Sequence, residues 1–391
     1  MVKNQGNVVV ALALCAAFNA LSAEAASTDS WPMYQANPQH TGYIAQTLLP
    51  TQAKFDWSAK AQASTPSGLA IANGLVLTTP TTYFNNTAPI VAQNLFTGET
   101  EWSQDFGAVF SVNQPAVADG MIYLQTSNNY GSTYLHCYLV DGTFMWRAPF
   151  GSQWEHYLGP IVVNGNVYFD GGSYGGIYSF TAGDGGSNWF TGLPQYDQWS
   201  PTWADGLLVA YTNELDVIAP DTGLKIVTIP DPDYYWSGYS PNQSAVVLGD
   251  YAYVTNGGRL MAYDMLAQNI AWATNIAATG QIATDGTQLF MIAGGALSVR
   301  NPANGALLWS WVPTASGSVT TNLIVTDSHV IAGDGTNTYL INRTTHKTDG
   351  APFGTSGKLA YGGDRLVVAD ANGVVHSYFL PSDKMYANGF E

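Results

Sequence analysis

A tryptophan returns at a nearly constant interval along this 391-residue chain. Intervals of 45, 44 and 43 residues separate the first four members, and the last two lie 37 residues apart: Trp57, Trp102, Trp146, Trp189, Trp272 and Trp309. A turn pair and an alternating apolar run precede each step, as in Asn73-Gly74 before LVLT. A period near 40 residues, built from short strands and tight turns, is typical of a β-propeller. The spacing therefore predicts an all-β fold.

The turn pairs indicate eight units of four antiparallel strands. Asn-Gly and Asp-Gly tolerate the positive φ that two-residue hairpin turns require. Eight such pairs precede apolar runs: Asn73-Gly74, Asp119-Gly120, Asn164-Gly165, Asp205-Gly206, Gly249-Asp250, Asp285-Gly286, Asp327-Ser328 and Gly363-Asp364. A second turn, such as Thr97-Gly98 or Asp141-Gly142, comes before the tryptophan strand in most units. In two units, residues 226–229 and 344–348 are expected to take the place of that strand.

The two ends of the repeat have complementary defects. Trp57 lies in KFDWSAK, which has no three strands before it, whereas residues 358–380 lack a last strand. We therefore expect residues 55–59 to complete the last blade, giving a single eight-bladed propeller closed by its N-terminal strand. Closure removes the open sheet edges that would otherwise aggregate. An open two-sheet sandwich is the alternative, but a sandwich needs no fixed repeat.

The N-terminus predicts export. Lys3, the apolar residues 8–21 and the sequence Ala23-Glu24-Ala25 form the three parts of a signal peptide, with cleavage after Ala25. The apolar part is too short for a permanent membrane span, so no integral membrane segment is expected. The expected divisions are a signal peptide at 1–25, the propeller at 26–380 and a tail at 381–391, with a periplasmic or extracellular location. Cys15 leaves a lipoprotein open, although Leu14 stands where a small residue is preferred, and Cys137 is expected to be a buried thiol.

The charge excludes one class of partner. The formal net charge is −16, and only 10% of the residues are charged. Such a surface repels nucleic acid phosphates and disfavours strongly anionic polymers.

The repeat resembles a known family. The turn pair, the alternating apolar run and the later Gly-x-x-x-Trp are similar to the PQQ-like, or quinoprotein-type, propeller repeat over about residues 31–380. The opening residues Trp31–Gln35 and Gln39–Tyr43 resemble the segment that precedes the first blade in such proteins. The family includes dehydrogenases and the BamB-type outer-membrane assembly scaffold. The resemblance implies that the six repeating tryptophans pack between adjacent blades. The final residues 385–391 weakly resemble Gly-Phe-Glu tails of some secreted proteins; a frayed terminus is the alternative.

The loops expected on the funnel face are asymmetric. Aromatic and polar residues fill four of them, around Phe106 and Phe110, 153–157, 195–203 and 231–239, whereas 277–280, 314–318 and 354–357 are small and bland. Tyrosine and tryptophan give a large amphipathic surface at low entropy cost, which suits glycans or extended peptides. The ligand-binding residues we predict are Trp154, Tyr157, Tyr196, Trp199, Tyr235 and Trp236. Of these, exposure is expected for all except Tyr196. The alternative is that the rings only pack the loops together.

The residues favour a non-catalytic binding or scaffold protein, with a glycan, an extended peptide or an envelope protein as partner. No cofactor or metal is predicted. A PQQ- and calcium-dependent dehydrogenase is one alternative, but the family's vicinal cysteine pair is absent. A polysaccharide lyase or hydrolase is the other, with His156, Tyr157 and Asp197 as candidate catalytic residues. The sequence leaves the oligomeric state open.

Overall fold

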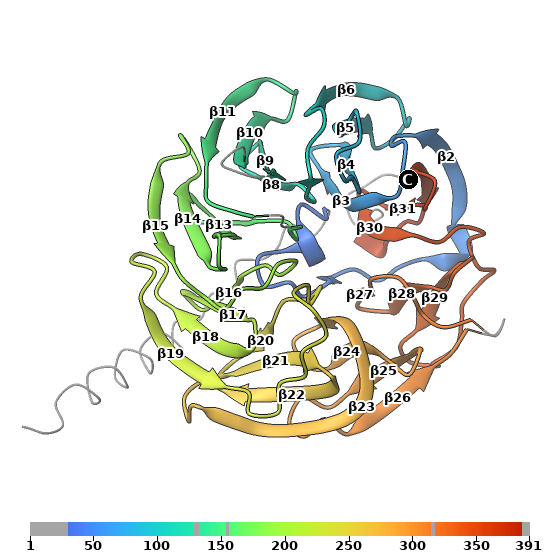
Figure 1. Ribbon diagram of the computed structural model, residues 1–391. Helices are drawn as coiled ribbons and strands as arrows, with labels where there is room; N and C mark the ends of the chain where they lie inside the picture. Colours follow the sequence, from blue (N-terminus) through green and yellow to red (C-terminus); the bar gives the residue numbers. More distant parts are fainter. Residues whose placement is uncertain (1–29, 129–132, 154–155, 314–316, 385–391) are drawn as a thin grey trace, which may run out of the picture.

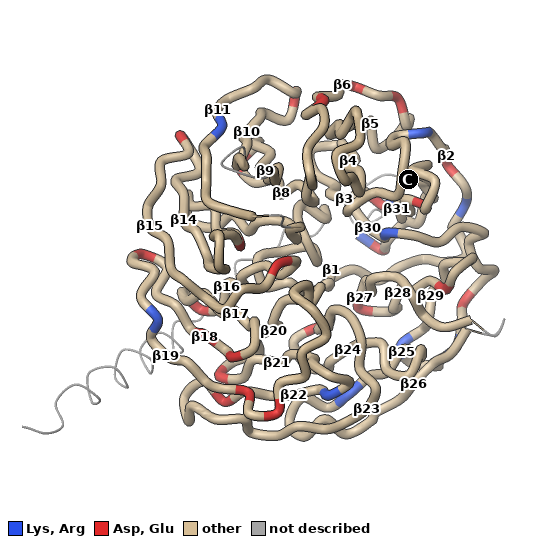
Figure 2. Tube along the Cα trace, in the orientation of Figure 1, with Lys and Arg blue, Asp and Glu red and all other residues tan. Residues whose placement is uncertain are grey.

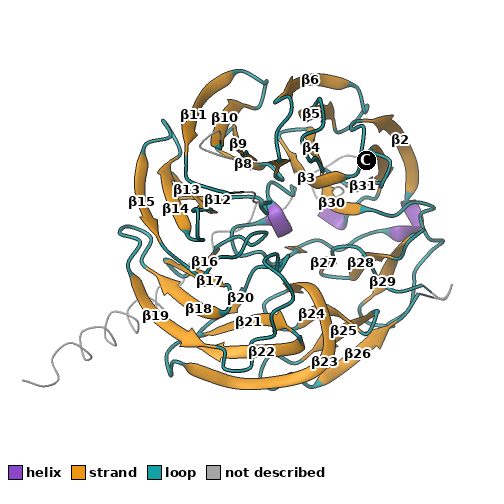
Figure 3. Ribbon diagram, viewed as in Figure 1, coloured by secondary structure: helices purple, strands orange, loops and turns teal. Residues whose placement is uncertain are grey.

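The computed structural model describes residues 30–128, 133–153, 156–313 and 317–384. Figure 1 shows β-sheets arranged around a common centre, each running from an inner to an outer strand. The helical elements within the described residues are short 3-10 turns, η1 (Tyr34–Ala36) and η2 (Pro50–Gln52), as Figure 3 shows. None of the helices in these ranges is long and apolar enough to cross a membrane. The all-β propeller fold predicted from the repeat is confirmed.

Four sheets follow the chain in order through the first half of the protein. Three are four-stranded and antiparallel: β3 (Pro66–Ala72), β4 (Leu75–Pro80), β5 (Pro89–Asn94) and β6 (Thr100–Asp105); β12 (Ile161–Val163), β13 (Asn166–Asp170), β14 (Ile177–Thr181) and β15 (Ser187–Thr191); β16 (Thr202–Ala204), β17 (Leu207–Tyr211), β18 (Glu214–Ile218) and β19 (Lys225–Pro230). In the remaining sheet two short inner strands both pair with the same neighbour: β7 (Ser111–Val112), β8 (Ala116–Ala118), β9 (Met121–Ser127), β10 (Tyr134–Leu139) and β11 (Phe144–Pro149).

A long strand joins the next two repeats into one seven-stranded sheet. Its members are β20 (Val246–Leu248), β21 (Tyr251–Asn256), β22 (Gly258–Asp264), β23 (Asn269–Thr284), β24 (Leu289–Ala293), β25 (Ala296–Arg300) and β26 (Leu307–Trp311). The first part of β23 pairs with β22, and from Ala278 onward it pairs with β24, with a register shift between Thr279 and Ala283. The loop expected at 277–280 is therefore part of a continuous strand. Because this sheet is unbroken, the count of eight separate blades stays a prediction.

The two ends of the repeat region lie in one sheet, as the complementary defects predicted. The N-terminal β2 (Lys54–Lys60) pairs antiparallel with β32 (Val374–Phe379), which continues through β31 (Arg365–Ala369) to β30 (Lys358–Gly362). Arg365 reinforces the join, because its Nε lies 2.9 Å from the Asp56 carboxylate across the two chain ends. Strands more than 300 residues apart in the sequence thus complete a single sheet.

The sheet of the seventh repeat differs from the prediction. It contains β27 (Ile324–Thr326), β28 (His329–Gly333) and β29 (Thr338–Asn342), but residues 344–348 form no outer strand. Two isolated bridges, Ile341 to Thr348 and Thr338 to Phe353, cover the outer edge instead. The fourth strand is β1 (Tyr43–Ile44), which pairs parallel with β27 on the inner side. The polar sequence Thr344–Thr348 has no apolar alternation to hold a strand in place.

The repeating tryptophans contact the next repeat. Indole N–H groups of Trp57, Trp102 and Trp189 donate to carbonyls there, at 2.9, 2.9 and 2.7 Å. The rings also lie against a turn glycine of that repeat. A Cβ added at Gly98, where φ is +75°, would lie 2.5 Å from Cε3 of Trp57. Each of these close contacts needs a residue that has no side chain and tolerates positive φ.

Not every repeat has glycine at this turn position: Gln268, with φ +56°, takes it in the repeat of Trp272, and His346 takes it in the repeat that follows Trp309. His346 has φ +57°, and its ring stacks on Trp309 with centroids 4.5 Å apart and planes 9° apart. Cys137 is fully buried, as predicted, and burial raises the pKa of its thiol to about 11. The predicted signal peptide at 1–25, with Cys15, and residues 385–391 of the predicted tail lie outside the described residues.

Candidate functional site

The residues that precede the first sheet run across the centre of the ring, as the position of η1 in Figure 1 shows. We call residues 31–46 the axial segment. Its carbonyls accept N–H groups from the inner edges of five sheets: Ile71 to Trp31 at 2.8 Å, Val117 to Pro32 at 2.8 Å, Trp203 to Pro38 at 2.9 Å, Thr284 to Thr41 at 2.7 Å and Val325 to Gly42 at 2.7 Å. Inner-edge donors that would lack a partner are thus satisfied. The axial segment links the sheets across the middle of the protein.

His40 anchors this segment. The side chain is fully buried, with Nδ1 3.0 Å from the Tyr34 carbonyl oxygen and Nε2 3.0 Å from the Pro201 carbonyl oxygen. Burial lowers the pKa of His40 to about 4, although both carbonyls favour the protonated ring. The imidazole therefore ties the axial segment to the sheet of β16–β19.

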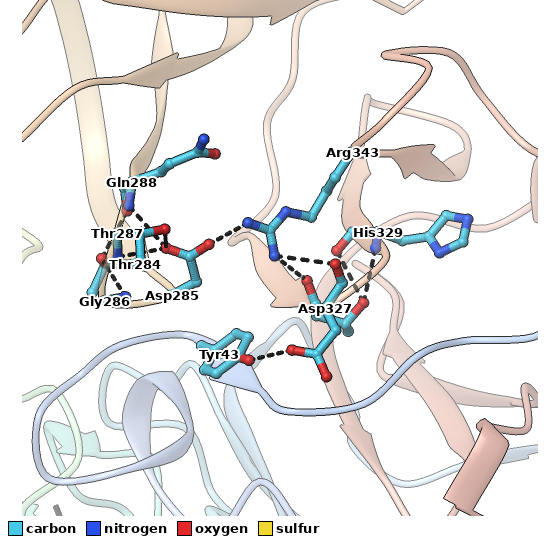
Figure 4. A network of polar contacts seen from close by, with 10 residues as sticks. Tyr43, Thr284, Asp285, Gly286, Thr287, Gln288, Asp327, His329 and Arg343 are labelled. Atoms are coloured by element: carbon cyan, nitrogen blue, oxygen red, sulfur yellow. Dashed lines mark hydrogen bonds and ion pairs between the residues drawn. The ribbon is translucent and has the colours of Figure 1, made fainter.

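A polar network fixes the end of the segment, as Figure 4 shows. Tyr43 donates a hydrogen bond to Asp327, and the Arg343 guanidinium pairs with Asp285 from the neighbouring sheet. Arg343 also donates to the Thr326 carbonyl at 2.6 Å. The network fixes β1 in its sheet through Asp327 and joins that sheet to the neighbouring seven-stranded sheet through Asp285.

Beside the axial segment lies a pocket of about 360 Å³ on the axis of the ring, which we call the axial pocket. Trp31, Tyr34 and Gln35 of the axial segment form part of its wall, and the starts of inner strands from several sheets form the rest. Lys358, at the start of β30, is the charged residue that lines it among the described residues. Lys358 is not recognisable as a pocket residue from the sequence, because nothing in one repeat shows which residue faces the axis.

An exposed aromatic surface lies on the loop between β19 and β20, and the same loop reaches the pocket at Asn242. Tyr235, Trp236 and Tyr239, which we call the aromatic surface, are 61, 60 and 58% exposed, and Asn242 of the same loop lines the pocket. The rings of Trp236 and Tyr239 meet edge to face, 5.8 Å between centroids. The exposure predicted for Tyr235 and Trp236 is confirmed, and Tyr239 belongs with them.

Hydrogen bonds from both sides hold this loop. Asn256 accepts from the Tyr235 N–H at 2.7 Å and donates to the Tyr235 carbonyl at 2.9 Å. On the other side, the Asp197 N–H donates to the Tyr239 carbonyl at 2.8 Å, and Ser240 donates to the Asp197 carboxylate. Because the backbone is fixed, the exposed rings lose little further freedom when a partner binds.

Two of the other predicted exposures are wrong. Trp199 is 1% exposed, and its indole N–H donates to the Tyr196 carbonyl at 3.1 Å. Tyr157 is 6% exposed, and its hydroxyl pairs with Ser152. Trp199 fills the space between loops, which is the packing alternative stated above, whereas Tyr157, although buried, lines the axial pocket. Tyr196 is half-buried against Tyr234 and Tyr239, and Trp154 lies outside the described residues.

The three candidate catalytic residues lie close together but act mainly on loop structure. The Asp197 carboxylate accepts from the backbone N–H of His156 at 3.0 Å, so it holds a main chain and not an imidazole. The His156 ring packs against Phe110, 4.7 Å between centroids. Burial lowers the pKa of His156 and raises that of Asp197. Tyr157 is buried beside them.

The residues of the axial pocket do not fit PQQ. The cofactor carries three carboxylates, whereas Lys358 is the cation that the described pocket wall offers. No group of three His, Cys, Asp or Glu residues that could hold a metal occurs in the part of the chain described.

Comparison with known proteins places the fold. Residues 50–136 match the family described as "Outer membrane protein assembly factor BamB". Among curated proteins, none matches this sequence significantly.

Solved structures with a similar fold include BamB from Moraxella catarrhalis, with TM-score 0.65 and 14% identity over 84% of this chain and 99% of that one. For a europium-containing methanol dehydrogenase the TM-score is 0.67 and the sequence identity is 12%, over 90% of this chain and 98% of that one. For the quinohemoprotein alcohol dehydrogenase from Comamonas testosteroni the TM-score is 0.68 and the identity is 14%, over 95% of this chain and 84% of that one. At such identities these structures share the fold alone. Taken with the match at residues 50–136, they support the resemblance to the PQQ-like repeat, and the fold they share with this chain is that of a propeller.

Proposed function

We propose that this chain is a non-catalytic binding or scaffold propeller of the cell envelope, and that it binds a glycan on the aromatic surface. The observation that carries the proposal is the exposure of Tyr235, Trp236 and Tyr239 on a loop that is fixed from both sides. Exposed aromatic rings of this size mark interaction sites when they are grouped.

A glycan is favoured over other partners by the chemistry of the surface. Flat rings offer apolar faces to the C–H groups of a sugar, and the phenol and indole edges can hydrogen bond to its hydroxyls. An extended peptide or an envelope protein would use the same rings differently, as apolar anchors. The match to an outer-membrane assembly factor at residues 50–136 supports an envelope location, periplasmic or extracellular, with the predicted cleavage after Ala25.

The enzymatic alternatives receive less support. His156, Tyr157 and Asp197 would need a free imidazole or carboxylate facing a substrate, and the Asp197 carboxylate is engaged by His156 N–H and Ser240. A dehydrogenase would need ligands for three carboxylates and a metal.

The test is binding of the mature protein to a glycan array and to solubilised envelope proteins. The triple variant Tyr235→Ala/Trp236→Ala/Tyr239→Ala is expected to lose glycan binding while keeping its thermal unfolding temperature, because these side chains are exposed. Phe144→Ala, on outer strand β11 and 54% exposed, is the matched control and should bind as the parent does. Equal glycan binding by the triple variant, or binding to proteins alone, would contradict the proposal.

A further inference from the structure

We infer that the axial pocket is a second binding site, for a small polyhydroxylated molecule with one carboxylate, such as a sugar acid, whose carboxylate pairs with the Lys358 ammonium. This site is separate in its chemistry from the aromatic surface and does not require the proposed glycan partner. The charge, the positioning and the surroundings of Lys358 support it.

Lys358 is an unpaired cation in an acidic protein. The chain has 12 Lys and Arg against 28 Asp and Glu, and Arg259, Arg343 and Arg365 each pair with an aspartate. Within the described residues, no ion pair or hydrogen bond involves the Lys358 ammonium, although acidic residues are in excess. Figure 2 shows how few positive positions the ring carries. A lysine without a protein partner, on a pocket wall, is available to an anionic ligand.

The surroundings of Lys358 combine contact with water and crowding by protein. The side chain is exposed, yet it lines a concave pocket, so protein atoms surround it on several sides. This desolvation lowers the pKa of its amino group. A carboxylate bound beside the ammonium would favour its charged form and offset the solvation that the pocket wall removes.

The backbone that carries Lys358 is held in place. The Asn322 side chain donates to the Leu359 carbonyl and accepts from the Leu359 N–H, both at 2.9 Å. On the other side, a Cβ at Gly357 would lie 1.9 Å from the Ala369 carbonyl oxygen, so the chain passes there only as glycine. The start of β30 is therefore fixed on both sides of the lysine, and its position is preorganised.

The rest of the wall suits hydroxyl groups on a compact apolar frame. Tyr34, Ser67, Asn242 and Thr320 bring hydroxyl and amide groups to the pocket, and Trp31 and Leu69 add apolar surface. A volume of about 360 Å³ falls in the range of small-molecule sites. One cation on the wall matches one carboxylate, and the net charge of −16 opposes a ligand that carries several.

The experiment is isothermal titration of the mature protein with sodium D-glucuronate, D-glucose and sodium acetate. We expect glucuronate to bind, and glucose and acetate to bind at least about tenfold more weakly. Glucose lacks the carboxylate that would pair with Lys358, and acetate lacks the hydroxyl groups that the rest of the wall would bind. Lys358→Met should lose at least about tenfold in glucuronate affinity. Lys347→Met, at an exposed lysine away from the pocket wall, is the matched control and should bind as the parent does.

Three results would overturn the inference. They are no binding of glucuronate to the parent, equal binding by a folded Lys358→Met variant, and acetate binding as tightly as glucuronate. The triple variant of the aromatic surface separates the two proposals, because it should still bind glucuronate in the axial pocket. If the triple variant loses glycan-array binding, the inference about the axial pocket is unaffected. If Lys358→Met loses glucuronate binding, the proposed glycan binding on the aromatic surface is unaffected.

Discussion

Where the second turn of a repeat carries glycine, as at Gly98 and Gly142, that glycine is a contact residue as well as a turn residue. Thr97-Gly98 and Asp141-Gly142 are recognisable in the sequence as turns, and their positive φ values of +75° and +87° confirm that role. That the tryptophan of the preceding repeat lies against each glycine is not visible in either local sequence. The contact depends on how neighbouring sheets face each other, which only the fold specifies.

A matched pair of substitutions separates these two roles. Gly98→Ala and Gly120→Ala impose the same backbone strain, because φ is +75° and +74°, but a Cβ at Gly120 has nothing within 4 Å. Gly120→Ala should cost about 1 kcal/mol of unfolding free energy. Gly98→Ala should cost about 1–3 kcal/mol more, because its methyl group displaces Trp57. Urea unfolding measures both, and equal losses would show that the tryptophan contact contributes nothing.

The sequence could not show which of the predicted ligand-binding residues are exposed and which are buried. Tyr235 and Trp236 are exposed as predicted, whereas Trp199 and Tyr157 come from equally aromatic loops and are buried. Composition cannot separate these cases, because the difference lies in which loop covers which. Lys358 was missed for the same reason. Its neighbours in sequence, Gly357 and Leu359, are ordinary for the start of a strand.

At the scale of elements, the pattern predicted strands well and connections less well. The alternating runs gave the outer strand β19 at the Ile226–Ile229 position without a tryptophan. They failed at Thr344–Thr348, where the edge of β29 is covered by isolated bridges, and at β23, where one strand serves two repeats. In both places hydrogen bonding between neighbouring strands determines where a strand forms. That bonding cannot be recognised from the period of the local sequence.

The axial segment should make stability depend on pH through His40. The pKa of this residue falls from 6.5 in the unfolded chain to about 4 in the folded protein, chiefly through burial. Between these values the unfolded state binds more protons, so stability is complete above about pH 6.5 and is lost as pH falls toward 4. The full loss from His40 is about 3 kcal/mol.

The measurement is urea unfolding of the parent and of His40→Gln between pH 7 and pH 4.5. The variant should show a smaller fall in unfolding free energy over this range, whatever its stability at pH 7. His136 stays in both proteins, and its pKa, lowered to about 3 by burial, contributes equally to each. Identical pH profiles would mean that the His40 ring is not buried as a neutral imidazole.

At the scale of the whole molecule, the chain folds as a ring because its first and last strands share one sheet. The pairing of the N-terminal strand with the last sheet joins the most distant segments of any predicted contact. It was predicted by counting strands and not from any local feature. The axial segment adds a second set of long-range links, from Ile71 to Val325, that counting could not show. Both sets hold the sheets around the pocket.

A cross-link between β2 and β32 tests this architecture most directly. The neighbouring pairs Ser58–His376 and Ala59–Val375 lie opposite each other, and paired positions alternate between wide and close spacing. One of the two double-cysteine variants, in a Cys137→Ala background, should therefore oxidise to a disulfide in the folded monomer. In the chain-entropy model that bond raises the unfolding free energy by up to about 5 kcal/mol. Failure of both pairs to cross-link in the folded protein would contradict the closed ring.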